Sequence, residues 1–173
     1  MTEAMQFIVR EARREDMPEL RGIIERSFER GIYSFFANRS LVSADKIIVV
    51  ELEGRIIGFA EPRQVRIRKE KLGNILWLAT HPDFRRIGVA SRLVDECIRY
   101  LRDIETTSIY VSIEGDNQAS LELFKDKGFA RMRFSELTKL FKFHVLSLYS
   151  KFMIAPHERV MVLNLGKRTT ATS

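Results

Sequence analysis

The sequence has one cysteine, four prolines and no long apolar run. The single cysteine, Cys97, can form no internal disulfide, which fits a reducing cytosol. No apolar run approaches the roughly 20 residues that a membrane-spanning helix needs. The opening stretch MTEAMQFIVREARRED is too acidic and too interrupted for a secretory signal. We therefore expect a cytoplasmic protein with no membrane partner.

Metal-ligand spacing and nucleophile motifs are also missing. The three histidines, His81, His144 and His157, are too dispersed to suggest a ligand set, so we expect no metal. The net charge of +6 permits acidic partners, but the basic residues are scattered. Their densest cluster, residues 63–71, lacks the interleaved aromatic residues of a single-strand binder. Nucleic acid is therefore not expected as the primary partner.

What remains is the composition of an ordinary globular protein, with 45% apolar and 30% charged residues. We expect a single domain over residues 1–166 and a disordered tail over 167–173. Periodicity and turn residues predict, in order, a strand at 7–12, a helix at 14–28, a less regular aromatic stretch at 29–44, a hairpin at 46–67, a strand at 74–80, a helix ending near 102, a strand at 108–115, a helix at 117–129, a strand at 129–134, a partly helical excursion at 135–158 and a strand at 159–165. This order indicates a mixed α/β or α+β sheet.

Single residues mark the ends and faces of the predicted helices. Asp16 and Asn117 stand at N-cap positions, and Gly128 stands just beyond the end of the 117–129 helix. Cys97 falls on the apolar stripe of the helix that ends near residue 102, so we expect it in the core.

The segment HPDFRRIGVASRL, residues 81–93, links the apolar strand to that helix. A strand that turns into a helix presents unpaired backbone N–H groups, and the helix dipole adds partial positive charge. Gly88 and Ala90 keep the approach to these groups clear, while Arg85 and Arg86 supply charged donors. The turn could be a plain helix start with solvated arginines, but the combination suits a pyrophosphate.

Three motifs resemble the GNAT superfamily of acyl-CoA N-acyltransferases. RRIGVA resembles its R/Q-x-x-G-x-G/A signature, FIVREARREDMPEL its first strand and helix entry, and NQASLELFKDKGF its later Asn-x-x-Ala motif. The resemblance covers roughly residues 6–134 in the right order. It implies a strongly twisted, mostly antiparallel sheet flanked by helices. It also implies an N-acetyltransferase in which an amine attacks acetyl-CoA directly.

The resemblance assigns roles to particular residues. In the family, backbone N–H groups of the signature loop hold the coenzyme A pyrophosphate. The preceding strand pairs with the pantetheine arm like an added β-strand, and the Leu78 N–H matches the donor that stabilises the oxyanion. Asn117 matches an asparagine near the reactive end of the coenzyme. The implied coenzyme contacts are Leu78, Ala79, Thr80, Arg85, Arg86, Ile87, Gly88, Val89, Ala90, Ser91, Asn117 and Phe124.

The sequence departs from the family at the catalytic acid. Phe124 stands where the family usually has a tyrosine whose hydroxyl protonates the leaving thiolate. A phenyl ring cannot donate a proton, so the acid would be water, Tyr149 or Tyr33, unless turnover is slow. A thiol pKa of about 8.5 makes the thiolate a tolerable leaving group near neutral pH. For both tyrosines, simple packing is the alternative role.

The general base is also open, because Asn74 stands where some family members have a glutamate. Glu61 and Glu51 are the remaining candidates, and either could instead be a solvated strand residue. Without an obvious base, an acceptor with a low pKa is easier to use. At pH 7 deprotonation costs roughly 4.6 kcal/mol for a lysine and about 1 kcal/mol for an α-amine. This difference favours a peptide or protein N-terminus, or an amino-acid-like molecule, over a lysine side chain.

Two further functions compete with the enzyme. A catalytically weak member could bind acyl-CoA as a sensor or regulatory module, and the basic hairpin could contact nucleic acid or the ribosome. Aromatic residues of the 29–44 stretch and the 135–158 excursion could line the acceptor site or a homodimer contact. The residues do not identify the acceptor amine.

Overall fold

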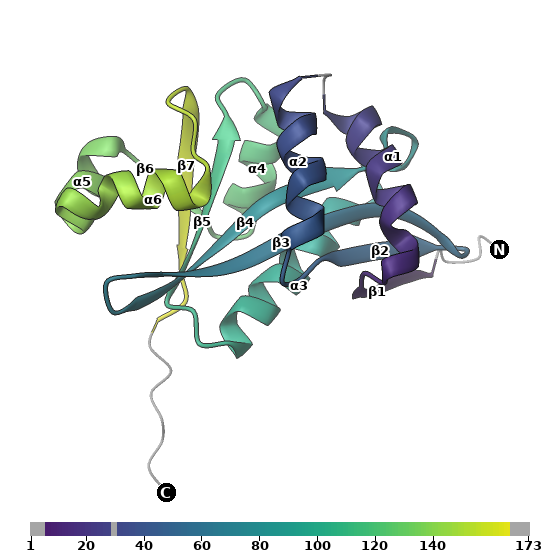
Figure 1. Cartoon of the computed structure of the whole chain (residues 1–173), viewed down its shortest axis with the longest axis horizontal. Coiled ribbons are helices and arrows are strands. Elements are labelled where there is room, and N and C mark those ends of the chain that lie inside the picture. The colour runs from purple at the N-terminus through teal and green to yellow at the C-terminus, as the bar shows by residue number, and fades with distance from the viewer. Residues whose placement is uncertain (1–5, 29–30, 167–173) are drawn as a thin grey trace, which may run out of the picture. The chain divides into compact units, whose positions relative to one another are not determined.

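The computed structural model describes residues 6–28 and 31–166, so the tail predicted at 167–173 lies outside the described residues. Its strands are β1 (Phe7–Glu11), β2 (Ile48–Leu52), β3 (Arg55–Ile67), β4 (Glu70–Thr80), β5 (Ser108–Glu114), β6 (Ala130–Met132) and β7 (Glu158–Asn164). Its α-helices are α1 (Met17–Ser27), α2 (Ile32–Ser43), α3 (Val89–Asp103), α4 (Gln118–Asp126), α5 (Phe134–Phe141) and α6 (Val145–Phe152). Short 3₁₀ turns are η1 (Arg14–Asp16), η2 (Pro82–Phe84) and η3 (Lys142–His144). Figure 1 labels the strands and the α-helices.

The strands form one seven-stranded sheet in the order β1-β2-β3-β4-β5-β7-β6. Strands β1 and β2, β2 and β3, β5 and β7, and β6 and β7 pair antiparallel. Strands β4 and β5 pair parallel, and this pairing covers Leu72–Asn74 of β4 and Ser108–Tyr110 of β5. The predicted mixed, mostly antiparallel sheet flanked by helices is confirmed.

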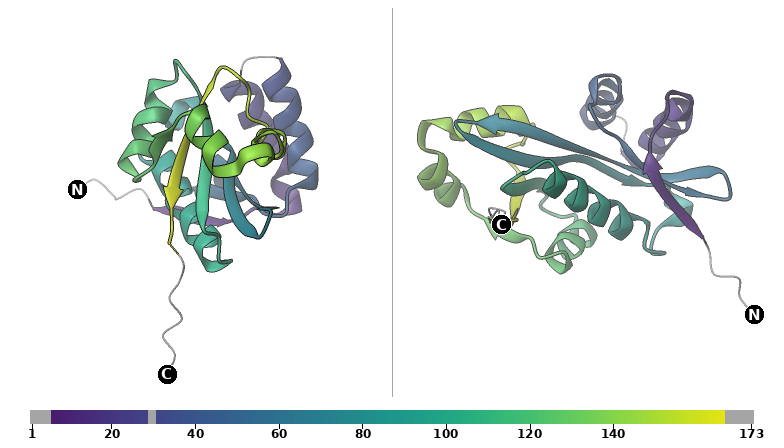
Figure 2. Two further views of the ribbon diagram at one scale, coloured as in Figure 1. Left: turned by 90° about the vertical axis from the view of Figure 1, so that its left-hand side faces the viewer. Right: turned by 90° about the horizontal axis from the view of Figure 1, so that it is seen from below.

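Contacts within the chain divide it into two compact units. The first contains residues 1–62 and 77–97, and the second contains residues 63–76 and 98–173. In the first unit, α1 and α2 lie on one face of the sheet and the start of α3 lies on the other (Figure 2). Gly58 permits the close approach of α3, because a Cβ there would lie 2.7 Å from Val89 Cγ1 and 3.0 Å from the Ala79 carbonyl oxygen. Cys97 is fully buried, as predicted.

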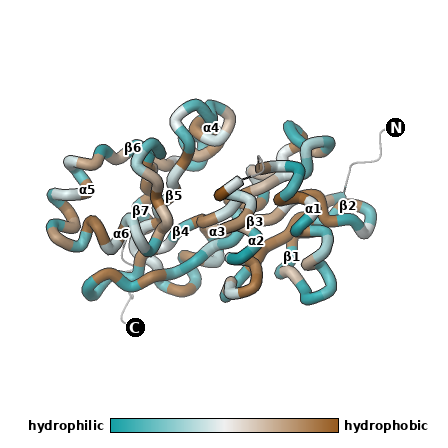
Figure 3. The backbone as a smooth tube through the Cα atoms, turned by 45° about the horizontal axis from the view of Figure 1, so that its top comes forward, coloured by the Kyte–Doolittle hydropathy of each residue, from teal (hydrophilic) through white to brown (hydrophobic). Residues whose placement is uncertain are grey.

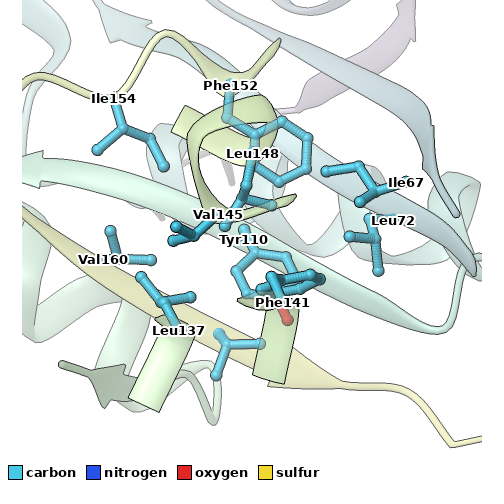
Figure 4. Packing of buried hydrophobic residues seen from close by; sticks show 11 residues of the cluster. Ile67, Leu72, Tyr110, Leu137, Phe141, Val145, Leu148, Phe152, Ile154 and Val160 are labelled. Carbon is cyan, nitrogen blue, oxygen red and sulfur yellow. The ribbon is translucent and has the colours of Figure 1, made fainter. Parts of the chain in front are cut away.

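The second unit has its own apolar core. Side chains of α5 and α6 pack there against strands, and Figure 4 shows them gathered around Tyr110. The Tyr110 ring centroid lies 5.9 Å from that of Phe141 and 5.8 Å from that of Phe152. The 135–158 excursion therefore contributes an apolar helix face to this core. The buried members of the cluster are Ile67, Leu72, Tyr110, Leu137, Phe141, Val145, Leu148, Phe152, Ile154, Val160 and Val162.

The prediction of a less regular segment at 29–44 was wrong, because α2 occupies Ile32–Ser43. Only Ala37 and Leu41 of this helix are buried, whereas Phe35 and Val42 are exposed. The apolar residues therefore form no single stripe, and the sequence lacks the periodicity that marks a helix packed on a core.

Asp16 stands at the predicted N-cap of α1, but its side chain makes no hydrogen bond to that helix. Its carboxylate instead accepts hydrogen bonds from the Arg13 backbone N–H at 2.6 Å and from Arg10 at 2.7 and 3.1 Å. The hydrogen bonds from Arg10 hold the pKa of Asp16 below its usual range. Asp16 thus links η1 to β1.

Candidate active site

The turn between β4 and α3 has a defined backbone. The His81 N–H donates to the Ile57 carbonyl of β3 at 2.8 Å, and the Phe84 N–H donates to the His81 carbonyl at 2.9 Å. After η2, Arg86 adopts a φ of 64° and Gly88 a φ of 87°, both in the left-handed region. Successive residues of alternating handedness turn their N–H groups toward one side, which is the geometry of an anion-binding nest.

The amides of this turn have no protein acceptor. In the described part of the chain, no N–H group of residues 86–91 donates a hydrogen bond to another residue. The Arg92 N–H makes the first bond of the helix, to the Gly88 carbonyl at 3.1 Å. A Cβ built on Gly88 would meet nothing within 4 Å, so the space in front of these amides is open. Together with the α3 dipole, they fit a diphosphate.

The side chains at this turn add positive charge. Arg85 and Arg86 are both exposed. Neither forms an ion pair with a carboxylate within residues 6–28 and 31–166. An anion at the amides would therefore find two guanidinium groups available for charge-assisted hydrogen bonds.

His81 anchors the turn to two other elements of the first unit. Its ring is 4% exposed, and Nε2 lies 2.8 Å from Nη1 of Arg26 in α1 and 3.3 Å from Nη2 of Arg55 in β3. Guanidinium groups can only donate, so Nε2 accepts. Nδ1 faces Asp83, whose backbone N–H lies 3.3 Å away and whose Oδ2 lies 3.7 Å away. The Arg55 guanidinium also covers the Phe84 ring at 5.5 Å, and that ring packs edge-on against His81. Burial, more than any nearby charge, lowers the pKa of His81.

This arrangement gives the stability a pH dependence. Because the folded protein holds His81 neutral, the unfolded chain binds more protons once pH falls below about 6.5, the ordinary histidine pKa. The contribution of His81 is thus complete above that pH and is lost as pH falls through the lower folded pKa. We expect the difference in urea midpoint between wild type and His81→Asn to shrink between about pH 7 and pH 5. A difference that stays constant over this range would contradict the assignment.

Strand β4 places its predicted coenzyme residues next to the turn. Leu78 and Thr80 are half-buried and Ala79 is buried. The hydroxyl of Thr80 is buried and has no hydrogen-bond partner among the described residues. The Ser27 Oγ at the end of α1 donates to the Thr80 carbonyl at 3.2 Å, and the ring of Phe28 packs edge-on against that of Trp77 at 5.4 Å. An orphaned buried hydroxyl beside an anion site is consistent with a polar ligand along this strand.

The two base candidates differ in their surroundings. Glu61 of β3 is 1% exposed, and its two carboxylate oxygens lie 2.8 and 2.7 Å from the Oγ of Ser40 in α2, which donates to them. Glu51 forms an ion pair with Arg10 at 2.8 Å. Glu61 is therefore a buried carboxylate on a strand next to β4, whereas Glu51 is tied to a cation. The alternative that Glu61 is a solvated strand residue is excluded.

The remaining predicted residues lie in the second unit. Asn117 caps α4, where its Oδ1 accepts from the Ser120 N–H at 3.1 Å. Phe124 is buried against Phe129, with ring centroids 5.1 Å apart. Tyr149 packs edge-on against Phe134, and burial raises its pKa. The N-cap predicted for Asn117 is confirmed, and coenzyme contact by these side chains stays a prediction.

Asn74, at the position where some family members have a glutamate, is buried at the end of the β4–β5 pairing. Its Nδ2 donates to the Tyr110 carbonyl at 3.0 Å, and its Oδ1 has no partner among the described residues. Asn74 and Tyr110 form the last residue pair of the parallel β4–β5 pairing. Leu78 and Thr80 lie beyond this pairing on β4.

Within the described chain, no cluster of histidine, cysteine or acidic side chains could hold a metal ion. No described helix has the length and hydropathy to cross a membrane.

A mixed sheet with a glycine-containing, amide-rich turn between a strand and a helix is the arrangement that the resemblance to GNAT proteins predicts. The acetyltransferase (GNAT) family model matches residues 8–129, and the chain belongs to this family. It is 21% identical over 139 residues to an N-alpha-acetyltransferase of Sulfurisphaera tokodaii, covering 74% of this chain and 83% of that protein. It is 29% identical over 98 residues to a mycothiol acetyltransferase of Amycolatopsis mediterranei, covering 54% of this chain and 33% of that protein.

The fold also matches solved structures. The NatC complex bound to Gag peptide and CoA contains a chain that superposes with a TM-score of 0.71 at 16% identity. The match covers 93% of this chain and 99% of that chain. At this identity the likeness concerns the fold.

Proposed function

We propose that the protein is an acetyl-CoA-dependent N-acetyltransferase that acylates an α-amine. The free N–H groups of residues 86–91 carry this proposal, because they form a diphosphate site at the start of α3. The pyrophosphate of acetyl-CoA would bind there, with Arg85 and Arg86 as additional donors. Family membership and the CoA bound in the NatC complex support this donor.

With the diphosphate in the turn, the pantetheine arm would run back along β4. Leu78 and Thr80 lie beyond the stretch of β4 that pairs with β5, so this part of the strand suits an added extended chain. The unpartnered Thr80 hydroxyl would find a hydrogen-bond partner in the amide groups of that arm. The acetyl group would then lie near Leu78.

The reaction needs little side-chain chemistry. A neutral amine attacks the thioester carbonyl carbon, a C–N bond forms, and the carbonyl electrons move onto oxygen. The Leu78 N–H would stabilise this oxyanion. Collapse breaks the C–S bond, the amine proton passes to a base, for which we propose Glu61, and the thiolate is protonated by water or by Tyr149. Positioning of the two reactants supplies much of the acceleration.

The choice of an α-amine rests on the protonation of the acceptor and on the relatives. Glu61 is a buried carboxylate, and the Oγ of Ser40 donates to its oxygens. An acceptor that is already partly neutral at pH 7 reduces the demand on such a base. The name of the Sulfurisphaera tokodaii relative and the peptide in the NatC complex agree with this choice.

We expect kcat/KM at pH 7 to be about 400-fold higher for a short peptide with a free N-terminus than for the same peptide with a blocked N-terminus and one lysine. The ratio should fall by about tenfold at pH 9, because lysine then gains neutral amine while the α-amine is already neutral. The measurement is release of free coenzyme A thiol in the two peptide series. Equal values of kcat/KM for the two peptides at pH 7 would contradict the α-amine proposal. Such a result would not contradict the proposed coenzyme site.

A sensor without turnover is the second candidate, because Phe124 and Asn74 replace groups that assist catalysis in the family. Sustained thiol release above hydrolysis, with any amine in a panel that includes polyamines, aminoglycosides and amino acids, would exclude it. Acetyl-CoA binding without such release would favour it.

A further inference from the structure

The turn between α5 and α6 carries large apolar side chains that face away from the core. Leu140 is 52% exposed, Phe143 95% and Leu146 73%. Their neighbours in the sequence, Phe141 and Val145, are buried in the core cluster of the second unit. The core of this unit therefore fixes the two helices and leaves the three side chains on the outer surface. We call Leu140, Phe143 and Leu146 the apolar tip.

The apolar tip is surrounded by positive charge. Residues 137–153 contain Lys139, Lys142, Lys151 and His144 but no aspartate or glutamate. Hydrophobic and hydrophilic stretches alternate along α5 and α6 in Figure 3. The one acidic residue of α5 and α6 is Glu136, in the first turn of α5, where its carboxylate accepts from the Arg133 N–H at 2.6 Å. A helical surface with exposed large apolar residues between lysines is typical of segments that lie on membrane surfaces.

The β3–β4 hairpin extends this positive surface within the second unit. The Nζ of Lys151 donates to the Arg66 carbonyl at 3.0 Å, and Arg63 donates to the Lys151 carbonyl, so the hairpin lies against α6. Residues 63–71 contain five basic residues and one acidic residue, Glu70. Lys71 forms an ion pair with Glu105 at 3.0 Å. The other basic residues of the hairpin belong to an element that is hydrogen-bonded to α6, so their charge and that of α6 can act on one partner.

We propose that the apolar tip and its lysines dock the protein on an anionic phospholipid surface. The side chains Leu140, Phe143 and Leu146 would enter the boundary between headgroups and acyl chains, and the lysines would contact the lipid phosphates. This differs from the sequence-based expectation of no membrane partner, which considered only spanning segments. A bilayer contact needs no spanning helix.

Other occupants fit this surface less well. A second copy of the chain would bring the same lysines against one another, which disfavours a symmetric contact. Nucleic acid would pair with the lysines and could stack on Phe143, but the aliphatic side chains of Leu140 and Leu146 cannot stack on bases. An anionic bilayer satisfies both the apolar and the charged components.

The test is co-sedimentation of the full chain with vesicles at low salt. We expect binding to vesicles of equal parts phosphatidylcholine and phosphatidylglycerol, and little binding to phosphatidylcholine alone. Phe143→Ser should weaken the binding about tenfold, because one large side chain no longer enters the lipid. Replacing Lys139 and Lys142 together by glutamine should weaken it by a further factor of about ten. Val42→Ser on α2 is the matched control, since Val42 is 78% exposed outside this surface.

Each other result overturns the proposal. If the wild-type protein does not bind anionic vesicles, insertion of the apolar tip is excluded. Insertion is also excluded if the Phe143→Ser variant binds these vesicles as tightly as the wild type. Tighter binding to a mixed-sequence RNA that survives Phe143→Ser identifies a nucleic-acid surface instead. A concentration-dependent dimer in light scattering, lost in Phe143→Ser and without vesicle binding, identifies a second copy. If Phe143→Ser raises KM for the amine and leaves vesicle binding unchanged, the apolar tip belongs to the acceptor site instead.

Discussion

Replacing Gly88 by glutamate should abolish the binding of acetyl-CoA while the protein stays folded. The new side chain would project into the open space beside Gly88 and place a negative charge where we propose that the diphosphate binds. Loss of two charge-assisted hydrogen bonds alone corresponds to at least about a 100-fold weaker affinity. Isothermal titration calorimetry with acetyl-CoA measures this effect directly.

Gly54 offers a matched control for the backbone strain of that substitution. It lies in the β2–β3 turn with a φ of 79°, close to the 87° of Gly88, and a Cβ there also meets nothing within 4 Å. Gly54→Glu should therefore cost similar stability through its positive φ but leave acetyl-CoA affinity unchanged. Undiminished binding by Gly88→Glu, or an equal loss in both variants, would argue against the turn as the coenzyme site.

Replacing Glu61 by glutamine should lower kcat/KM by a factor of about 100 to 10,000, the usual contribution of a general base. Glutamine keeps the shape and can still hydrogen-bond to Ser40, so the fold and the affinity for acetyl-CoA should change little. The measurement is amine-dependent thiol release at saturating acetyl-CoA, with a urea midpoint recorded for the same variant.

Ser40→Ala separates the two possible roles of that carboxylate. It removes the hydrogen bonds that hold Glu61 against α2 but leaves the base in place. If Glu61 only holds α2, Ser40→Ala will lose stability and neither variant will lose rate per folded molecule. If Glu61 accepts the amine proton, only Glu61→Gln will show the large loss in rate.

Local signals were enough to predict most of the elements. The cap at Asn117 and the apolar stripe with Cys97 depend on nearby residues, and both are found in the structure. Strand β4 begins at Glu70 rather than at residue 74, because its first residues continue a hairpin with β3 instead of an apolar run. The 29–44 stretch was missed because α2 buries few of its apolar residues.

The anchoring role of His81 could not be predicted from the sequence. Its partners Arg26 and Arg55 are distant along the chain and meet only when α1 and β3 pack. The same holds for Ser40 and Glu61, which come together across α2 and β3. Pairings between elements depend on tertiary packing, and a single sequence carries no signal for them.

The burial of Cys97 makes the protein a convenient subject for thiol chemistry. Burial raises the pKa of this thiol, so in the folded state it remains protonated and shielded from reagents. A dithiobis-nitrobenzoate assay on the native protein consequently reports coenzyme A alone, with no background from the polypeptide. In denaturant the same sulfur becomes reactive, so the absorbance change per chain then measures the fraction of unfolded protein.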